Sequence, residues 1–96
     1  MQEEEFRRFL ENDPSITSEK AVNSRMSRAR RIEQEFKINI DYTVRDDDRM
    51  YAALLNVKDK DSAGNFQNVI RKYYIFINSK KFPTLSTYSN KLKKVR

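Results

Sequence analysis

The chain contains very few residues that turn or cross-link a polypeptide, and this scarcity constrains its fold more than any other feature. Its 96 residues include one glycine, two prolines and no cysteine. Glycine and proline are the main turn-forming residues, so a β-sandwich with many turns is disfavoured and helices are expected. The length is that of a single domain.

Apolar residues at helical spacing predict two helices in the first third of the chain. The first covers residues 2–12 and ends before Pro14, because the residue before a proline avoids the helical conformation. The second begins at a cap formed by Ser15 or Thr17 and runs to about Phe36. The apolar stripes consist of Phe6, Phe9 and Leu10 in the first helix and Val22, Met26, Ala29, Ile32 and Phe36 in the second.

Three further segments complete the predicted fold. Residues 46–48 supply a cap and an acidic first turn for a helix that ends near Lys58. The next helix is capped by Ser62 and ends near Ser79. Residues 81–96 form either a short fifth helix or a basic tail. The stripes are Met50, Tyr51, Leu54 and Leu55, then Phe66, Val69, Ile70, Tyr73 and Ile77, then Leu85, Tyr88, Leu92 and Val95.

Two features do not follow the helical pattern. Residues 37–42 alternate with period 2, but no obvious second strand exists to pair with them. We therefore expect an extended connector in which Ile38, Ile40 or Tyr42 fills the core. Ile75 lies off the stripe of its helix and needs another cover. The apolar edge of the C-terminal segment is expected either to cover Ile75 or to pack on a neighbouring chain. The predicted fold is all-α, with a compact four-helix bundle over residues 1–80 and a basic segment over 81–96.

The formal net charge of +6 is concentrated in two blocks. Residues 20–40 hold six basic and two acidic residues, and residues 66–96 hold eight basic and no acidic residues. Opposite the apolar stripe of the second helix lie Lys20, Ser24, Ser27, Arg28 and Arg31, with no acid among them. Such a charge distribution has two interpretations. The charges either keep the protein soluble and stabilise helix ends, or they form a surface that binds polyanions.

The residue inventory disfavours catalysis. Without cysteine or histidine there is no thiol nucleophile, no histidine triad and no zinc site of the usual ligands. The only glycine, Gly64, cannot form a glycine-rich phosphate loop. The acidic residues 46–48 lack the spacing of a calcium loop and are interpreted as helix-terminal charge. We expect no enzymatic activity, metal or cofactor.

The apolar runs are too short to span a membrane, and the acidic start is not that of a secretory signal. The chain also lacks tryptophan, which commonly anchors proteins at membrane interfaces. We therefore expect a cytoplasmic protein that does not bind membranes.

The order of the helices and a few of their residues carry a family resemblance. Phe9-Leu10 ends the first helix, and Ser15-Ile16-Thr17 opens the long basic helix. An acidic-start helix follows from Asp46 to Val57, and the last helix contains the run from Asn68 to Ile77. Over residues 5–79 the pattern resembles the core-binding, SAM-like domain of tyrosine recombinases, the phage integrases. It is also similar to amino-terminal modules of some mobile-element and restriction-system proteins.

The resemblance implies a helical clamp on duplex DNA, with the second and fourth predicted helices nearest the grooves. It adds Arg25, Arg71 and Lys72 to the candidate contacts. The catalytic domain of those recombinases is absent, so Tyr88 is not a nucleophile. Together with the basic blocks, the predicted DNA-binding residues are Lys20, Ser24, Arg25, Ser27, Arg28, Arg31, Arg71, Lys72, Lys80 and Lys81.

We predict a DNA-binding module that contacts phosphates and assists a larger recombination, mobile-element or defence assembly. Duplex DNA is favoured over single strands, because most aromatic residues near the last basic block are needed in the core. The alternative is a protein-interaction module, such as a phage-encoded inhibitor or adaptor that docks on an acidic partner. The acidic first helix and Ile75 motivate this alternative, and the C-terminal segment is a candidate contact with a partner or a second copy.

Overall fold

The computed structural model describes residues 1–61 and 63–94, and within them it contains six helices and no strand. The prediction of an all-α fold is confirmed. The cap expected at Ser62 and the stripe position at Val95 lie outside the described residues. The helices are α1 (Glu3–Glu11), α2 (Glu19–Glu35), α3 (Ile40–Thr43), α4 (Asp47–Lys58), α5 (Asn65–Asn78) and α6 (Leu85–Lys94).

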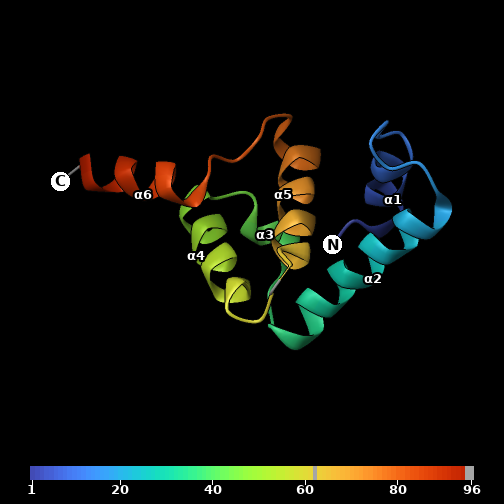
Figure 1. Cartoon of the computed structure of the whole chain (residues 1–96), viewed down its shortest axis with the longest axis horizontal. Helices are drawn as coiled ribbons and strands as arrows, with labels where there is room; N and C mark the ends of the chain where they lie inside the picture. Colours follow the sequence, from blue (N-terminus) through green and yellow to red (C-terminus); the bar gives the residue numbers. More distant parts are fainter. Residues whose placement is uncertain (62, 95–96) are drawn as a thin grey trace.

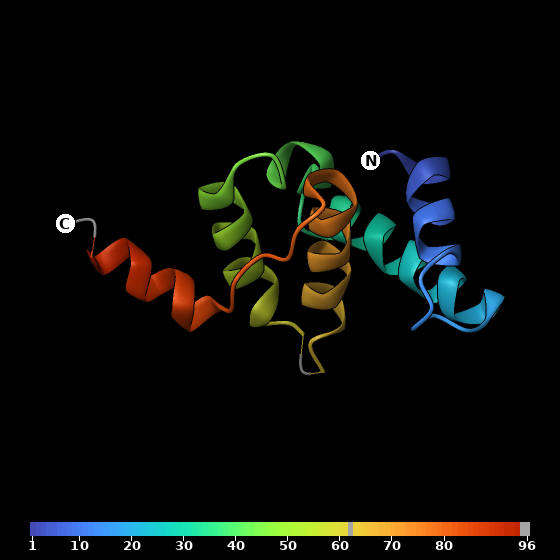
Figure 2. The ribbon, with the colours of Figure 1, turned by 90° about the horizontal axis from the view of Figure 1, so that it is seen from above.

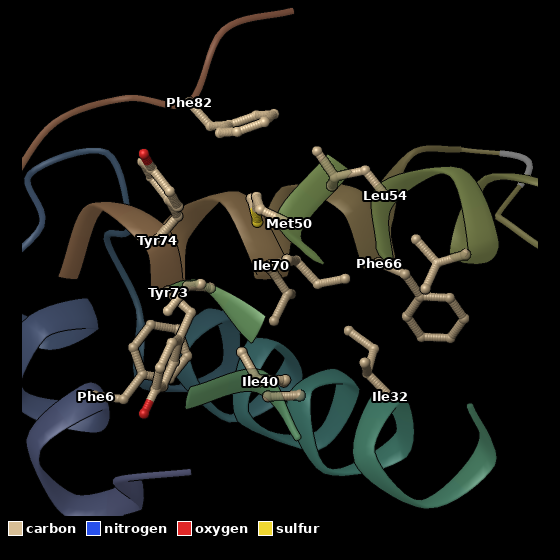
Figure 3. Packing of buried hydrophobic residues seen from close by; sticks show 14 of the residues in the cluster. Phe6, Ile32, Ile40, Met50, Leu54, Phe66, Ile70, Tyr73, Tyr74 and Phe82 are labelled. Atoms are coloured by element: carbon tan, nitrogen blue, oxygen red, sulfur yellow. The ribbon is translucent and has the colours of Figure 1, made fainter. Parts of the chain in front are cut away.

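Helix α5 is the centre of the molecule, with α4 on one side and α1 and α2 on the other (Figures 1 and 2). It is amphipathic over four turns and buries its apolar face against these neighbours. In the core, the ring centroids of Phe6 and Tyr73 lie 4.8 Å apart, and those of Tyr74 and Phe82 lie 5.2 Å apart (Figure 3). The buried residues of α5 are Phe66, Val69, Ile70, Tyr73 and Tyr74.

The predicted stripes of α1 and α2 face this core. Phe6 and Leu10 are fully buried, as are the stripe residues of α2 from Val22 to Ile32. The prediction for α4 is correct at Met50 and Leu54 and wrong at Leu55, whose exposed fraction is 42%. Val57 takes the place of Leu55 because it follows Leu54 by three residues on the same helical face.

Local hydrogen bonds explain where α2 begins and ends. Its N-cap is Ser18, not Ser15 or Thr17, and the Ser18 hydroxyl accepts a hydrogen bond of 3.1 Å from the amide of Ala21. Ser15 instead donates its amide and its hydroxyl to the Asp13 carboxylate. After α2, Lys37 has a left-handed φ of 57°, a conformation that commonly terminates helices.

The connector expected over residues 37–43 is wrong in part, because Ile40–Thr43 forms the one-turn helix α3. The Asn39 side chain accepts a hydrogen bond from the amide of Tyr42 at 3.0 Å, and Glu33 accepts one from the amide of Ile40 at 3.1 Å. Ile40 fills the core as expected, whereas Tyr42 is 56% exposed. Two side-chain caps outweigh a six-residue alternation that has no strand to pair with.

The start of α5 also differs from the prediction. Gly64 is its N-cap and adopts a left-handed φ of 73°, which glycine tolerates without steric cost. The Asp61 carboxylate accepts a hydrogen bond from the amide of Gln67 at 2.9 Å. An acidic side chain before the helix thus satisfies one of the free amides of its first turn.

The C-terminal segment is helical, and α6 extends away from the bundle (Figures 1 and 2). Thr84 caps it by accepting a hydrogen bond from the amide of Thr87. Tyr88 anchors it, because its buried ring lies 5.0 Å from that of Tyr51 and its hydroxyl donates to Asp48. The expectation that the apolar stripe of this segment covers Ile75 is wrong, because Ile75 lines a cavity with residues of α1 and α2, and from this segment Lys81, which precedes α6, lines it.

Candidate nucleic-acid interface

The face of α2 that points away from the core lines an open groove, here called the outer groove. It follows from the stripe that buries Val22, Met26, Ala29 and Ile32, because the residues between these positions must face solvent. Its lining residues are Lys20, Asn23, Ser24, Ser27, Arg28 and Arg31, with Glu19 at the start. Five of the predicted contact residues are therefore brought together here.

A second hollow, here called the cationic cavity, lies between α1, α2 and α5 and has a volume of about 310 Å³. Five cationic side chains line it: Arg25, Arg28, Arg71, Lys72 and Lys81. Arg28 also lines the outer groove, so the two hollows meet at this residue. Cations of two separate helices and of the chain after α5 thus surround one space.

Two cations of α2, Arg25 and Arg28, keep most of their hydrogen-bonding capacity for a ligand. Arg25 donates one hydrogen bond, from Nη1 to the carbonyl oxygen of Ala21 at 3.1 Å. Among the described residues, no ion pair involves Arg25 or Arg28. Because a guanidinium has five N–H donors, both side chains can bind phosphate oxygens.

Arg71 has a structural role that the sequence did not indicate. Its Nη1 donates hydrogen bonds to the carbonyl oxygens of Phe82 at 3.0 Å and of Pro83 at 3.1 Å. Burial lowers the pKa of Arg71, although an arginine remains charged at neutral pH. Arg71 therefore holds the chain between α5 and α6, which includes Lys81, against the bundle.

Lys72 is neutralised within the structure. It forms an ion pair with Asp13, whose side chain is 13% exposed. The hydrogen bond from Lys72, together with those from Ser15, lowers the pKa of Asp13 to about 2. This ion pair joins α5 to the turn between α1 and α2, so Lys72 contributes less free positive charge than the sequence predicted.

The α2 face is not as free of acids as its sequence indicated. Arg31 pairs with Glu35 one turn later, at 3.2 Å between Nε and Oε1. Arg30, next to it, pairs with Glu3 of α1 at 2.8 Å. Both pairs are exposed, so each stabilises the fold only weakly and gives way easily to a strong anion.

The remaining predicted residues differ in position. Lys81 lines the cationic cavity, whereas Lys80 is exposed and lines neither hollow. The prediction missed Asn65 and Asn68, which line the cavity from the first turns of α5. Their i, i+3 spacing on the side of the Val69 stripe was the available signal. Four apolar residues, here called the apolar floor, complete the lining, and among them Ile75 alone is partly exposed: Phe6, Leu10, Val69 and Ile75.

Other kinds of site find little support in the described chain. Residues 1–61 and 63–94 contain no group of three acidic, histidine or cysteine side chains that is able to hold a metal ion. Within the same residues, no helix has both the length and the apolar character needed to cross a membrane. The Tyr88 hydroxyl is bonded to Asp48, which raises its pKa to about 12 and opposes a nucleophilic role.

The fold and the two hollows define a class: a small all-α domain in which α2 and α5 contribute cations to one cavity. No protein-family model, curated protein or solved structure matches the chain. The resemblance to the core-binding domain of tyrosine recombinases therefore stays a prediction.

Proposed function

We propose that this protein is a non-catalytic module that binds duplex DNA mainly through its phosphates. Arg28 carries the proposal, because it lies where the outer groove meets the cationic cavity and forms no ion pair with a described residue. Arg25 extends the cationic surface towards α5, and Lys20, Ser24 and Ser27 extend it along α2. Cations and hydroxyls of this kind are common phosphate contacts.

The dimensions of α2 support the same proposal. A helix with its side chains is about 10–12 Å wide, and the major groove of DNA is about 12 Å wide. Helix α2 has 17 residues, and α6 projects from the opposite end of the molecule (Figure 2). The α2 face is therefore accessible to a rod-shaped ligand, and assistance to a larger recombination, mobile-element or defence assembly follows from the resemblance.

The test is a titration of a labelled duplex at about 50 and about 200 mM salt with wild type, Arg28→Gln and Lys58→Gln. Lys58 is an exposed matched control in the last turn of α4, and each variant removes one positive charge. We expect wild-type affinity to fall steeply with salt. Arg28→Gln should lower the salt slope by about one, which is about tenfold in affinity near 0.1 M salt, and Lys58→Gln should leave it unchanged.

Three outcomes would contradict the proposal: no duplex binding at low salt, binding that is indifferent to salt, and equal effects of the two variants. Circular dichroism of both variants checks that each keeps its helix content.

A second candidate is association with an acidic protein partner or a second copy through α6. Leu92 is 39% exposed on a helix that extends from the bundle, and Lys91 and Lys93 lie beside it. This candidate predicts no salt-dependent duplex binding, which is the outcome that excludes the first.

A further inference from the structure

The cationic cavity is lined by chemically different groups, and phosphate binding accounts for only some of them. Arg25, Arg28 and Lys81 provide positive charge, whereas Ile75 is the partly exposed residue of the apolar floor, in which Leu10 and Val69 are buried. A backbone phosphate of a duplex has no apolar surface to place there. At about 310 Å³ the cavity reaches the lower end of the range of small-molecule pockets, about 300 Å³.

Only some of the cations that line the cavity are available to a ligand. Arg71 donates to the carbonyl oxygens of Phe82 and Pro83, and Lys72 pairs with Asp13. Arg25, Arg28 and Lys81 are in no ion pair among the described residues. An anionic group is therefore expected between α2 and the chain after α5.

Asn65 and Asn68 add a third kind of group to the lining. Each carboxamide has a donor and an acceptor side by side, and asparagine pairs in this way with the edges of nucleobases. Both residues are exposed and adjoin the apolar floor at Val69. A ligand with an anionic end, a planar apolar body and a polar edge matches the three kinds of lining group: the cations, the apolar floor and the two asparagines.

We propose that the cationic cavity binds one nucleotide unit, with its phosphate at Arg25, Arg28 and Lys81 and its base against Ile75, the partly exposed residue of the apolar floor. Two sources carry this chemistry: a free nucleoside monophosphate and an unpaired nucleotide of a DNA strand. The second source rests on the proposed DNA binding. The cavity and the outer groove meet at Arg28. This favours the unpaired nucleotide of a DNA strand as the source, because a duplex on α2 places its strand at the cavity entrance.

The experiment compares three probes: a fully paired duplex, the same duplex with one unpaired nucleotide, and free dAMP. The variant Ile75→Trp fills the floor without a change of charge, and Leu55→Trp is the control, because Leu55 is exposed on α4 and does not line the cavity. Asn68→Ala, at an exposed position, tests the asparagines of the lining with little risk to folding.

We expect the duplex with the unpaired nucleotide to bind about tenfold more tightly than the paired duplex. Ile75→Trp should abolish this preference while paired-duplex affinity changes less than about twofold, and Leu55→Trp should keep it. Asn68→Ala should reduce differences among the four unpaired bases. If neither duplex binds but dAMP does, and Ile75→Trp abolishes dAMP binding, the cavity takes free nucleotides and the proposed DNA binding is wrong.

Equal binding of both duplexes by the wild-type protein, without dAMP binding, overturns the nucleotide site and leaves duplex binding intact. If Ile75→Trp keeps the preference for the duplex with the unpaired nucleotide, the nucleotide does not bind at Ile75 and the proposed location is wrong. Absence of binding to all three probes overturns both proposals.

Discussion

The acids at the start of α4 and two arginines of α2, Arg25 and Arg28, are used in opposite ways. Asp46 caps α4 and pairs with Arg49 at 3.2 Å, Asp47 accepts a hydrogen bond from Tyr74 at 2.8 Å, and Asp48 accepts one from Tyr88. All three acids are thus engaged within the fold.

On α2, Arg25 has one carbonyl partner and Arg28 is in no ion pair among the described residues. Both regions are rich in charged residues, but only the unpaired charges are available to a ligand. A charged residue that is paired within the fold has a structural role, whereas a charged residue without such a partner is available for binding.

The largest expected effect comes from exchanging one cation of each kind, Arg71→Ala and Arg28→Ala. Arg71→Ala removes the hydrogen bonds to the carbonyl oxygens of Phe82 and Pro83 and should lower the free energy of unfolding by about 2 kcal/mol. Arg28→Ala should change it by less than about 0.5 kcal/mol. Urea unfolding measures both, and equal stability of the two variants would remove the distinction.

Asp13→Asn sharpens the comparison by releasing a cation. Loss of the ion pair with Lys72 should cost about 1 kcal/mol at neutral pH. The pKa of Asp13 is lowered from 3.8 to about 2, so its stabilising contribution is complete above about pH 4 and is lost as the pH falls towards 2. The variant should lack this acid dependence and bind duplex DNA more tightly through the released Lys72.

The measurements are urea unfolding at several pH values between 2 and 7 and the salt titration described for Arg28. An acid dependence that is the same in wild type and Asp13→Asn would show that this ion pair does not govern stability.

The smallest expected effect is at the α4–α6 contact. The hydrogen bond to Asp48, followed by burial, raises the pKa of Tyr88 from 10.0 to about 12. Because the folded pKa is raised, the contribution is complete below pH 10 and is lost as the pH rises from 10 to 12. Tyr88→Phe should cost about 0.5–1 kcal/mol at neutral pH and reduce the alkaline loss.

Thermal unfolding at pH 8 and pH 11 compares Tyr88→Phe with wild type. DNA affinity at neutral pH should be unchanged, and a large loss of affinity would mean that α6 belongs to the interface.

Much of the fold was predictable, because helix formation here follows short-range patterns. The spacing of Val22, Met26, Ala29 and Ile32 identified the buried face of α2, and Asp46 identified the start of α4. The prediction failed for α3, where the caps at Asn39 and Glu33 act over a few residues but only with Ile40 seated in the core. The alternation of six residues does not show that Ile40 is buried in the core, so this pattern alone does not predict α3.

The sequence predicted cations that line the candidate site, but it did not predict the role of each of them. Arg25, Arg28, Arg71 and Lys72 were all selected, and all four line one cavity. Which of them is free could not be read from the sequence, because Lys72 finds its partner Asp13 59 positions earlier. Asn65 and Asn68 were missed as cavity residues, because their spacing places them beside the Val69 stripe but does not show that three helices enclose a cavity there.

The sequence by itself determined the helical class, the buried stripes and the two basic blocks, because spacing, capping and composition act within a few residues of one another. Only the tertiary structure decided that Arg71 supports the chain after α5, that Asp13 neutralises Lys72 and that Arg25 and Arg28 remain without ion pairs among the described residues. These outcomes depend on distances between side chains far apart in the chain, and such distances exist only after α1, α2 and α5 have packed together.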